Sequence, residues 1–181
     1  MLEKIERLIS EINKIHLKYA RDYFETGKVK KIELNRTLSE VSINDILKYR
    51  LNFHESINDY LIFADLENID FQYRVKSSES IQEKIDYFLK HQKSYPTEVI
   101  LNDILGVRIV LSDSDIIQLF ERLTLWREQF GLINWNLKQA KDYTVLCFYF
   151  KEKLAFSYPW ELQILDEDAK QTIVKRHQKK R

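Results

Sequence analysis

The chain has 181 residues, of which 44% are hydrophobic, and it carries 29 Lys and Arg against 28 Asp and Glu. This length suffices for one well-buried core, and the formal net charge of +1 excludes a protein-wide field that would attract nucleic acid or a membrane surface. The single cysteine, Cys147, excludes an internal disulfide framework and a thiolate zinc site. Because no apolar run has the length of a membrane span and the start lacks the apolar region of a signal peptide, we expect a cytoplasmic protein without a membrane partner.

Apolar residues recur at helical spacing over the first 24 residues and predict an amphipathic helix that ends near Gly27. Such a helix packs on its own domain or serves oligomerisation, so a second copy of the chain is a candidate partner. Further on, Ser42 with Asp45 three residues later has the pattern of a helix N-cap, and apolar residues at helical spacing then continue as far as Leu61.

From residue 69 onward the predicted elements alternate between strand and helix, which is typical of an α/β (or α+β) domain with a mixed β-sheet flanked by helices. The expected order is strand 69–76, helix 78–92, a short helical turn, strand 106–111, helix 114–129, strands at about 143–151 and 154–165, and a helix over 166–181. We expect one compact domain, in which an N-terminal helical segment (1–68) packs on the α/β core (69–181).

The segment at 71–84 is the first with a pattern that indicates chemistry. In a strand, Arg74 and Lys76 point from one face because side chains alternate. Nearby serines offer helix N-caps, and Ser80 and Lys84 then lie four residues apart on one helical face. Two cations, a capped helix N-terminus and a third cation one turn in would form a cradle for a polyphosphate. The alternative is an edge strand whose charges are simply solvated.

Two further segments place polar groups within apolar strands. Gly106 can turn the chain into a strand, which leaves Asp103 at the strand entrance, where carboxylates commonly meet metal ions or cap a helix. In the last strand, Glu161 and Gln163 share one face while the opposite face is apolar. A buried polar pair of this kind needs a ligand, a metal or a hydrogen-bond partner.

Together these segments resemble the synthetase domain of RelA/SpoT-type alarmone synthetases, over roughly residues 45–175. The matching elements are Arg-x-Lys-Ser followed by Ser-Ile-x-x-Lys, then Asp-Ile-x-Gly-x-Arg-Ile, and finally Glu-x-Gln-Ile. The resemblance implies a nucleotidyltransferase-like fold. It also implies that ATP and GDP or GTP are the partners, that Mg²⁺ is the cofactor, and that the β,γ-pyrophosphate of ATP passes to the 3′-hydroxyl of the guanosine nucleotide.

The resemblance also implies a role for each motif residue. The residues expected to bind ATP are Arg74, Lys76, Ser80, Lys84 and Arg108. The positive charges of the lysines and arginines among them would face its phosphates. Asp103 would bind Mg²⁺, and Glu161 would share the metal or activate the attacking hydroxyl. The residues expected to bind the acceptor are Tyr143, Gln163, Lys138 and Lys141. Phosphoryl-type transfer depends on positioning and charge neutralisation, so this set suffices if the fold brings Asp103 and Glu161 together.

The acceptor half departs from the family pattern Lys-x-x-Gly-Tyr-x-x-x-His. In one alignment Tyr143 replaces the tyrosine that stacks on guanine and Cys147 stands where the histidine is expected, on the same face of a strand. A second alignment matches Lys-Asp-Tyr at 141–143 to an upstream element and deletes most of the guanine loop. We favour the first because it keeps the following strand in register. The arginine that usually follows Glu-x-Gln-Ile is Leu165 here.

These departures leave three functions open. The first is alarmone synthesis, the second is pyrophosphate transfer to the 3′ end of tRNA, and the third is a nucleotide-binding or protein-interaction domain without catalysis. RNA ends are read by stacking and by phosphate contacts, for which Tyr143 and the basic residues at 175–181 are candidates. We expect Cys147, with its apolar neighbours, to be a core or pocket residue and not a nucleophile.

Overall fold

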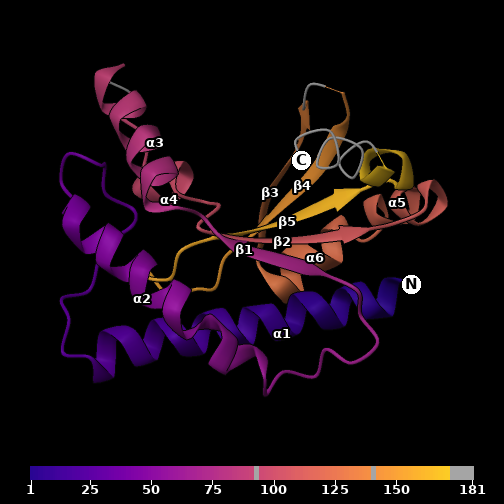
Figure 1. Cartoon of the computed structure of the whole chain (residues 1–181), viewed down its shortest axis with the longest axis horizontal. Helices are drawn as coiled ribbons and strands as arrows, with labels where there is room; N and C mark the ends of the chain where they lie inside the picture. The colour runs from indigo at the N-terminus through magenta and orange to yellow at the C-terminus, as the bar shows by residue number, and fades with distance from the viewer. Residues whose placement is uncertain (92–93, 140–141, 172–181) are drawn as a thin grey trace, which may run out of the picture.

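The computed structural model describes residues 1–91, 94–139 and 142–171. Its centre is a mixed five-stranded sheet with the strand order β1-β2-β5-β4-β3, flanked by helices (Figure 1), which confirms the predicted fold class. The strands are β1 (Gln72–Val75), β2 (Leu105–Val110), β3 (Leu132–Gln139), β4 (Thr144–Phe150) and β5 (Trp160–Leu165). β2 and β5 run parallel, and the other neighbouring pairs are antiparallel.

Three of the described helices begin at serines that act as N-caps. Ser42 accepts a hydrogen bond from the backbone N–H of Asp45 at the start of α2, as predicted, and Ser77 caps α3 through the N–H of Ser80. The helices are α1 (Leu2–Arg21) with the π-turn η1 (Asp22–Thr26), α2 (Ile43–Leu61), α3 (Ser78–Lys90), α4 (Thr97–Ile100), α5 (Asp113–Phe120) and α6 (Leu123–Phe130). None of these described helices is both long and apolar enough to cross a bilayer.

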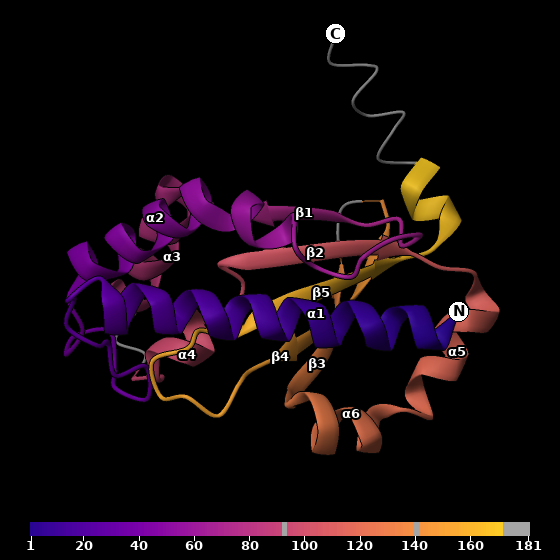
Figure 2. The ribbon, with the colours of Figure 1, turned by 90° about the horizontal axis from the view of Figure 1, so that it is seen from below.

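The hydrophobic core lies between α1 and one face of the sheet. Figure 2 shows α1 running beneath the strands with α6 nearby. The apolar stripe of α1 is buried there, and the indole of Trp126 in α6 packs on the rings of Phe148 and Phe150 in β4. In β5 the side chains of Trp160 and Leu162 belong to this core. Because one face of the sheet is covered in this way, polar side chains in the same strands must lie on the other face.

The predicted helix over 114–129 is wrong in one respect, because the structure has two helices there. α5 ends at Phe120 and α6 begins at Leu123. In the break, Arg122 donates a hydrogen bond of 2.8 Å to Glu6 of α1, and Trp126 donates one of 3.1 Å to the same carboxylate. These contacts with a distant helix stabilise the break, and helical periodicity alone does not reveal them.

The strand predictions also need correction. β3 was not predicted, because its polar residues conceal an alternation in which Trp135 and Leu137 point to one face and Asn136 and Lys138 to the other. The strand predicted over 154–165 is shorter, since β5 begins only at Trp160. Pro159, directly before it, has no N–H to donate to a sheet ladder. Of the predicted C-terminal helix, 167–171 are helical and the remainder lies outside the described residues.

Candidate active site

The polar residues singled out in the sequence gather on the open face of the sheet, opposite α1. Residues that lie directly opposite one another in paired strands point to the same face. One row across this face, in strand order, consists of Arg74, Gly106, Glu161 and Tyr149. The next row consists of Gln72, Arg108, Gln163, Cys147 and Asn136. The strand pairing therefore brings residues 72–74, 106–108 and 161–163 together, although they are far apart in the sequence.

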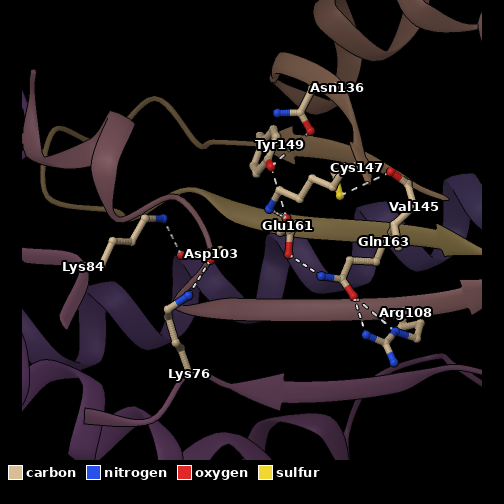
Figure 3. A network of polar contacts seen from close by, with 11 residues as sticks. Lys76, Lys84, Asp103, Arg108, Asn136, Val145, Cys147, Tyr149, Glu161 and Gln163 are labelled. Carbon is tan, nitrogen blue, oxygen red and sulfur yellow. Dashed lines mark hydrogen bonds and ion pairs between the residues drawn. The ribbon is translucent and has the colours of Figure 1, made fainter. Parts of the chain in front are cut away.

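Asp103 lies just before β2 and is almost fully buried. One of its carboxylate oxygens accepts a hydrogen bond of 2.8 Å from Lys76 Nζ, and the other accepts one of 3.1 Å from Lys84 Nζ (Figure 3). Burial raises the pKa of Asp103, but the charges and hydrogen bonds of Lys84 and Lys76 outweigh burial, so the pKa lies below its ordinary value. One carboxylate with two ammonium groups leaves one net positive charge, which favours an anion at this end of the sheet.

Glu161 in β5 has no exposed surface, and both of its carboxylate oxygens accept hydrogen bonds. Oε1 accepts from Lys138 Nζ and, at 3.1 Å, from the Tyr149 hydroxyl. Oε2 accepts from Gln163 Nε2 at 2.7 Å. Burial raises the pKa of Glu161, but the hydrogen bonds and charge of Lys138 outweigh burial, so the pKa lies below its ordinary value. The carboxylate is therefore ionised although it is buried.

Gln163 extends this network to the neighbouring strand. Its Oε1 accepts hydrogen bonds from Arg108 Nε at 3.1 Å and from Arg108 Nη2 at 2.7 Å (Figure 3). The side chains of Lys138, Glu161, Gln163 and Arg108 thus form a chain of polar contacts across β3, β5 and β2. The polar pair in β5 has hydrogen-bond partners, as the sequence required, and those partners include two cations from other strands.

Asp103 and Glu161 lie close enough to act on one another. The negative charge of Asp103 acts to raise the pKa of Glu161, although other contacts keep that pKa below its ordinary value. The pKa of Lys84 is lowered, chiefly by burial and in part by the positive charge of Lys138. Figure 3 shows the Asp103 carboxylate between Lys84 and Lys76, and the Glu161 carboxylate with its own partners in the same part of the site. The structure therefore brings together the two acidic residues that the sequence identified.

Arg74 lies across Gly106 on the same face. A Cβ atom at Gly106 would come within 3.2 Å of Arg74 Nε, so the glycine leaves the room that the guanidinium group occupies. Arg74 and Arg108 line a hollow of about 90 Å³ together with Gly106 and Gln163. A neighbouring hollow of about 120 Å³ shares Arg108 and has Val110, Leu165 and Lys170 in its lining.

The expected acceptor side is largely filled by apolar side chains. Tyr143, just before β4, is half-buried and packs with Cys147 against a small cluster that includes Ala169 from the C-terminal turn. Burial raises the pKa of the Cys147 thiol to about 12, which agrees with a packing role and not with a nucleophile. Lys141 and the basic residues at 175–181 lie outside the described residues.

The remaining predicted residues lie near the cradle. Ser80 is in the first turn of α3, where its hydroxyl accepts a hydrogen bond of 3.1 Å from the Ser77 hydroxyl. Sequence reasoning missed Tyr149 and the contact of Lys138 with Glu161. The alternation of Tyr143, Cys147 and Tyr149 could have placed Tyr149 on the site face, whereas no sequence signal connects Lys138 to Glu161.

The carboxylates fit a magnesium ion by their number and ionisation. Within residues 1–91, 94–139 and 142–171, no group of three or more His, Cys, Asp and Glu side chains could hold a metal ion alone. Mg²⁺ is usually bound through one or two carboxylates together with substrate phosphates and waters. Asp103 and Glu161, both ionised and in the same part of the site, match that smaller requirement.

No protein-family model and no curated protein matches the chain. Among solved structures, it is similar to small alarmone synthetase 1 from Bacillus subtilis bound to its product pppGpp, at 21% identity over 74% of this chain and 74% of that chain, with a TM-score of 0.42. The same enzyme bound to AMPCPP is 20% identical over 75% of this chain and 70% of that one, with a TM-score of 0.36. A GTP pyrophosphokinase family protein from Streptococcus pneumoniae is 17% identical over 75% and 70% of the two chains, with a TM-score of 0.42. A likeness at this level does not by itself assign a function to the chain.

Proposed function

We propose that this protein transfers the pyrophosphate group of ATP to the 3′-hydroxyl of GDP or GTP in a magnesium-dependent reaction. The observation that supports this most directly is that Asp103 and Glu161 lie at one end of the sheet with lysines on both carboxylates. Two ionised carboxylates and three ammonium groups suit a polyphosphate that arrives with a metal ion, because transfer depends on charge neutralisation and alignment.

The donor half of the site would hold ATP. Lys76 and Lys84 are half-buried and lie within reach of both Asp103 and the start of α3, so their ammonium groups would turn to the phosphates. Ser80 would add a hydroxyl contact in the first turn of α3, where backbone N–H groups also favour anions. Arg74 and Arg108 line one hollow, and their planar guanidinium groups can stack on a base as well as contact phosphate.

Asp103 and Glu161 would hold the Mg²⁺ ion, which when bound would neutralise charge on the phosphates of ATP. The lysines that now satisfy Asp103 would then pair with phosphate oxygens, so that no buried charge is left alone. On the acceptor side, Gln163 would position the nucleotide and Tyr143 would stack on its base.

The transfer itself would join the 3′-oxygen of the acceptor to the β-phosphorus of ATP. The bond between that phosphorus and the oxygen shared with the α-phosphate breaks, and AMP leaves. The proton of the 3′-hydroxyl would go to a base, and we assign that role to Glu161, a buried and ionised carboxylate of the site. The lysines and arginines of the face would stabilise the charge on the transferred group.

Incubation with ATP labelled in the γ-phosphate, in parallel with GDP, GTP and deacylated tRNA, tests the proposal. Labelled guanosine tetra- or pentaphosphate is the expected product. Labelled tRNA would instead show that RNA is the acceptor, and ATP binding without any labelled product would show a binding domain. Glu161→Gln, which keeps the size of the side chain, should abolish transfer with little loss of ATP binding. Full activity of this variant would remove Glu161 from its role.

A further inference from the structure

One oxygen of the Glu161 carboxylate, Oε1, has no acceptor position left for a substrate in the state described. Each carboxylate oxygen has about two acceptor positions. Oε1 accepts from both Lys138 and Tyr149, and Oε2 accepts from Gln163. The residue has no exposed surface at all. Oε1 therefore has no free position for the hydroxyl of an acceptor until one of its donors leaves.

Lys138 is the donor that can leave. Tyr149 is in β4, buried between two paired strands, and Gln163 is held in β5 by two hydrogen bonds from Arg108. Lys138 comes instead from β3, which is the last strand at one edge of the sheet, and 44% of its side chain is exposed. Its four-carbon stem lets the ammonium group swing without any change in the strand.

We propose that Lys138 blocks Glu161 until the phosphate groups of the acceptor nucleotide draw its ammonium group away. This inference rests on the function proposed above and adds a gate to it. The di- or triphosphate of an acceptor carries more negative charge than one carboxylate and is solvated on one side, so it competes for Lys138 at lower desolvation cost. Binding of the correct acceptor would then expose the base that the acceptor needs.

The gate has a chemical purpose, because water is a competing acceptor. In that side reaction a water oxygen attacks the β-phosphorus of ATP, the bond to the bridging oxygen of AMP breaks, and the water proton goes to Glu161. The products are AMP and pyrophosphate, and ATP is lost. With Lys138 and Tyr149 both on Oε1, a water molecule that arrives before the acceptor cannot pass its proton to that oxygen.

The test compares three variants by two readouts. Lys138→Met removes the charge, Lys138→Arg keeps it, and Lys153→Met removes an exposed lysine in the loop between β4 and β5 as a matched control. The first readout is AMP formed from ATP and Mg²⁺ without acceptor. The second is the affinity for GDP by calorimetry, without ATP or Mg²⁺. For Lys138→Met we expect roughly tenfold faster AMP formation and roughly tenfold weaker GDP binding. Lys138→Arg should restore both values toward wild type, and Lys153→Met should change neither.

Slower AMP formation by Lys138→Met with unchanged GDP affinity would overturn the gate and leave Lys138 as a structural partner of Glu161. Thermal melting of each variant checks folding. If Lys138→Met does not fold, Lys138→Arg still decides the test. A gate requires the arginine to suppress AMP formation as the lysine does. Wild-type protein that forms neither AMP nor a labelled product with any acceptor would instead refute the proposed function. The two failures are thus told apart by the wild type alone.

Discussion

Gly106 in β2 lies directly opposite Glu161 in β5, and a Cβ atom at Gly106 would come within 3.2 Å of Nε of Arg74, which is a tight contact. The backbone angle φ of Gly106 is not positive, so an alanine is tolerated by the backbone there. The glycine is needed for space on the site face and not for a turn.

We therefore expect Gly106→Ala to fold normally and to weaken ATP binding. The new methyl group would shift the Arg74 side chain by a few tenths of an ångström within the hollow that it shares with Arg108. A loss of about 1 kcal/mol, or roughly fivefold in affinity, is expected for one displaced cation. Calorimetry with ATP measures it. In a double variant with Arg74→Ala the effects should not add, and simple additivity would show that Gly106 acts through another group.

Asp103→Asn should remove the response to magnesium. The amide keeps the size of the side chain but cannot balance the ammonium groups of Lys76 and Lys84, and it is a poor ligand for Mg²⁺. We expect the transfer rate to fall by at least about a hundredfold at every Mg²⁺ concentration. Rates measured over a magnesium titration check this, with the exposed Asp59→Asn as the control. Recovery of the rate at high Mg²⁺ would show that Asp103 only tunes the affinity for the metal.

Cys147 should be unreactive in the folded protein. Its side chain is fully buried, and burial raises the thiol pKa to about 12, so almost no thiolate exists at neutral pH. We expect no alkylation by iodoacetamide until the protein is unfolded in denaturant, as followed by mass spectrometry. Cys147→Ala should retain transfer activity. Alkylation of the native protein within minutes would be inconsistent with this packing.

The stability of the fold should fall in mild acid because of His16. This residue of α1 is buried, its Nε2 has no hydrogen-bond partner among the described residues, and burial lowers its pKa to about 4. Between pH 6.5 and 4 the unfolded chain binds a proton at His16 that the folded chain does not, so the free energy of unfolding should drop by up to about 3 kcal/mol over this range. Below pH 4 this contribution no longer changes.

Urea unfolding at a series of pH values measures the effect. His16→Gln keeps a polar side chain but cannot be protonated in this range. The variant should show a flatter dependence of the unfolding free energy on pH, whatever its stability at pH 7. An equal slope in both proteins would assign the acid sensitivity to other groups.

Local features of the chain predicted a large part of the fold. The spacing of apolar residues predicted the buried stripe of α1 and strand β2, and single serines predicted the caps of α2 and α3. These signals act within a few residues of the chain. Strand β3 and the break between α5 and α6 were missed. β3 pairs with the next strand along the chain, but its polar residues conceal the alternation. The break is stabilised by a contact with a distant helix, that of Arg122 with Glu6.

The site divides in the same way. By itself the sequence determined which groups carry charge, namely the lysines and arginines of 74–84 and 108 and the carboxylates of 103 and 161. For Arg74, Arg108 and Glu161 it also determined the strand face that each occupies. Only the tertiary structure decided which charges meet. Lys76 reaches Asp103 across 27 residues, and Lys138 reaches Glu161 across 23. The strand order sets these pairings, and strand order arises from the packing of the whole sheet on α1, which is a property of the fold and not of any short segment.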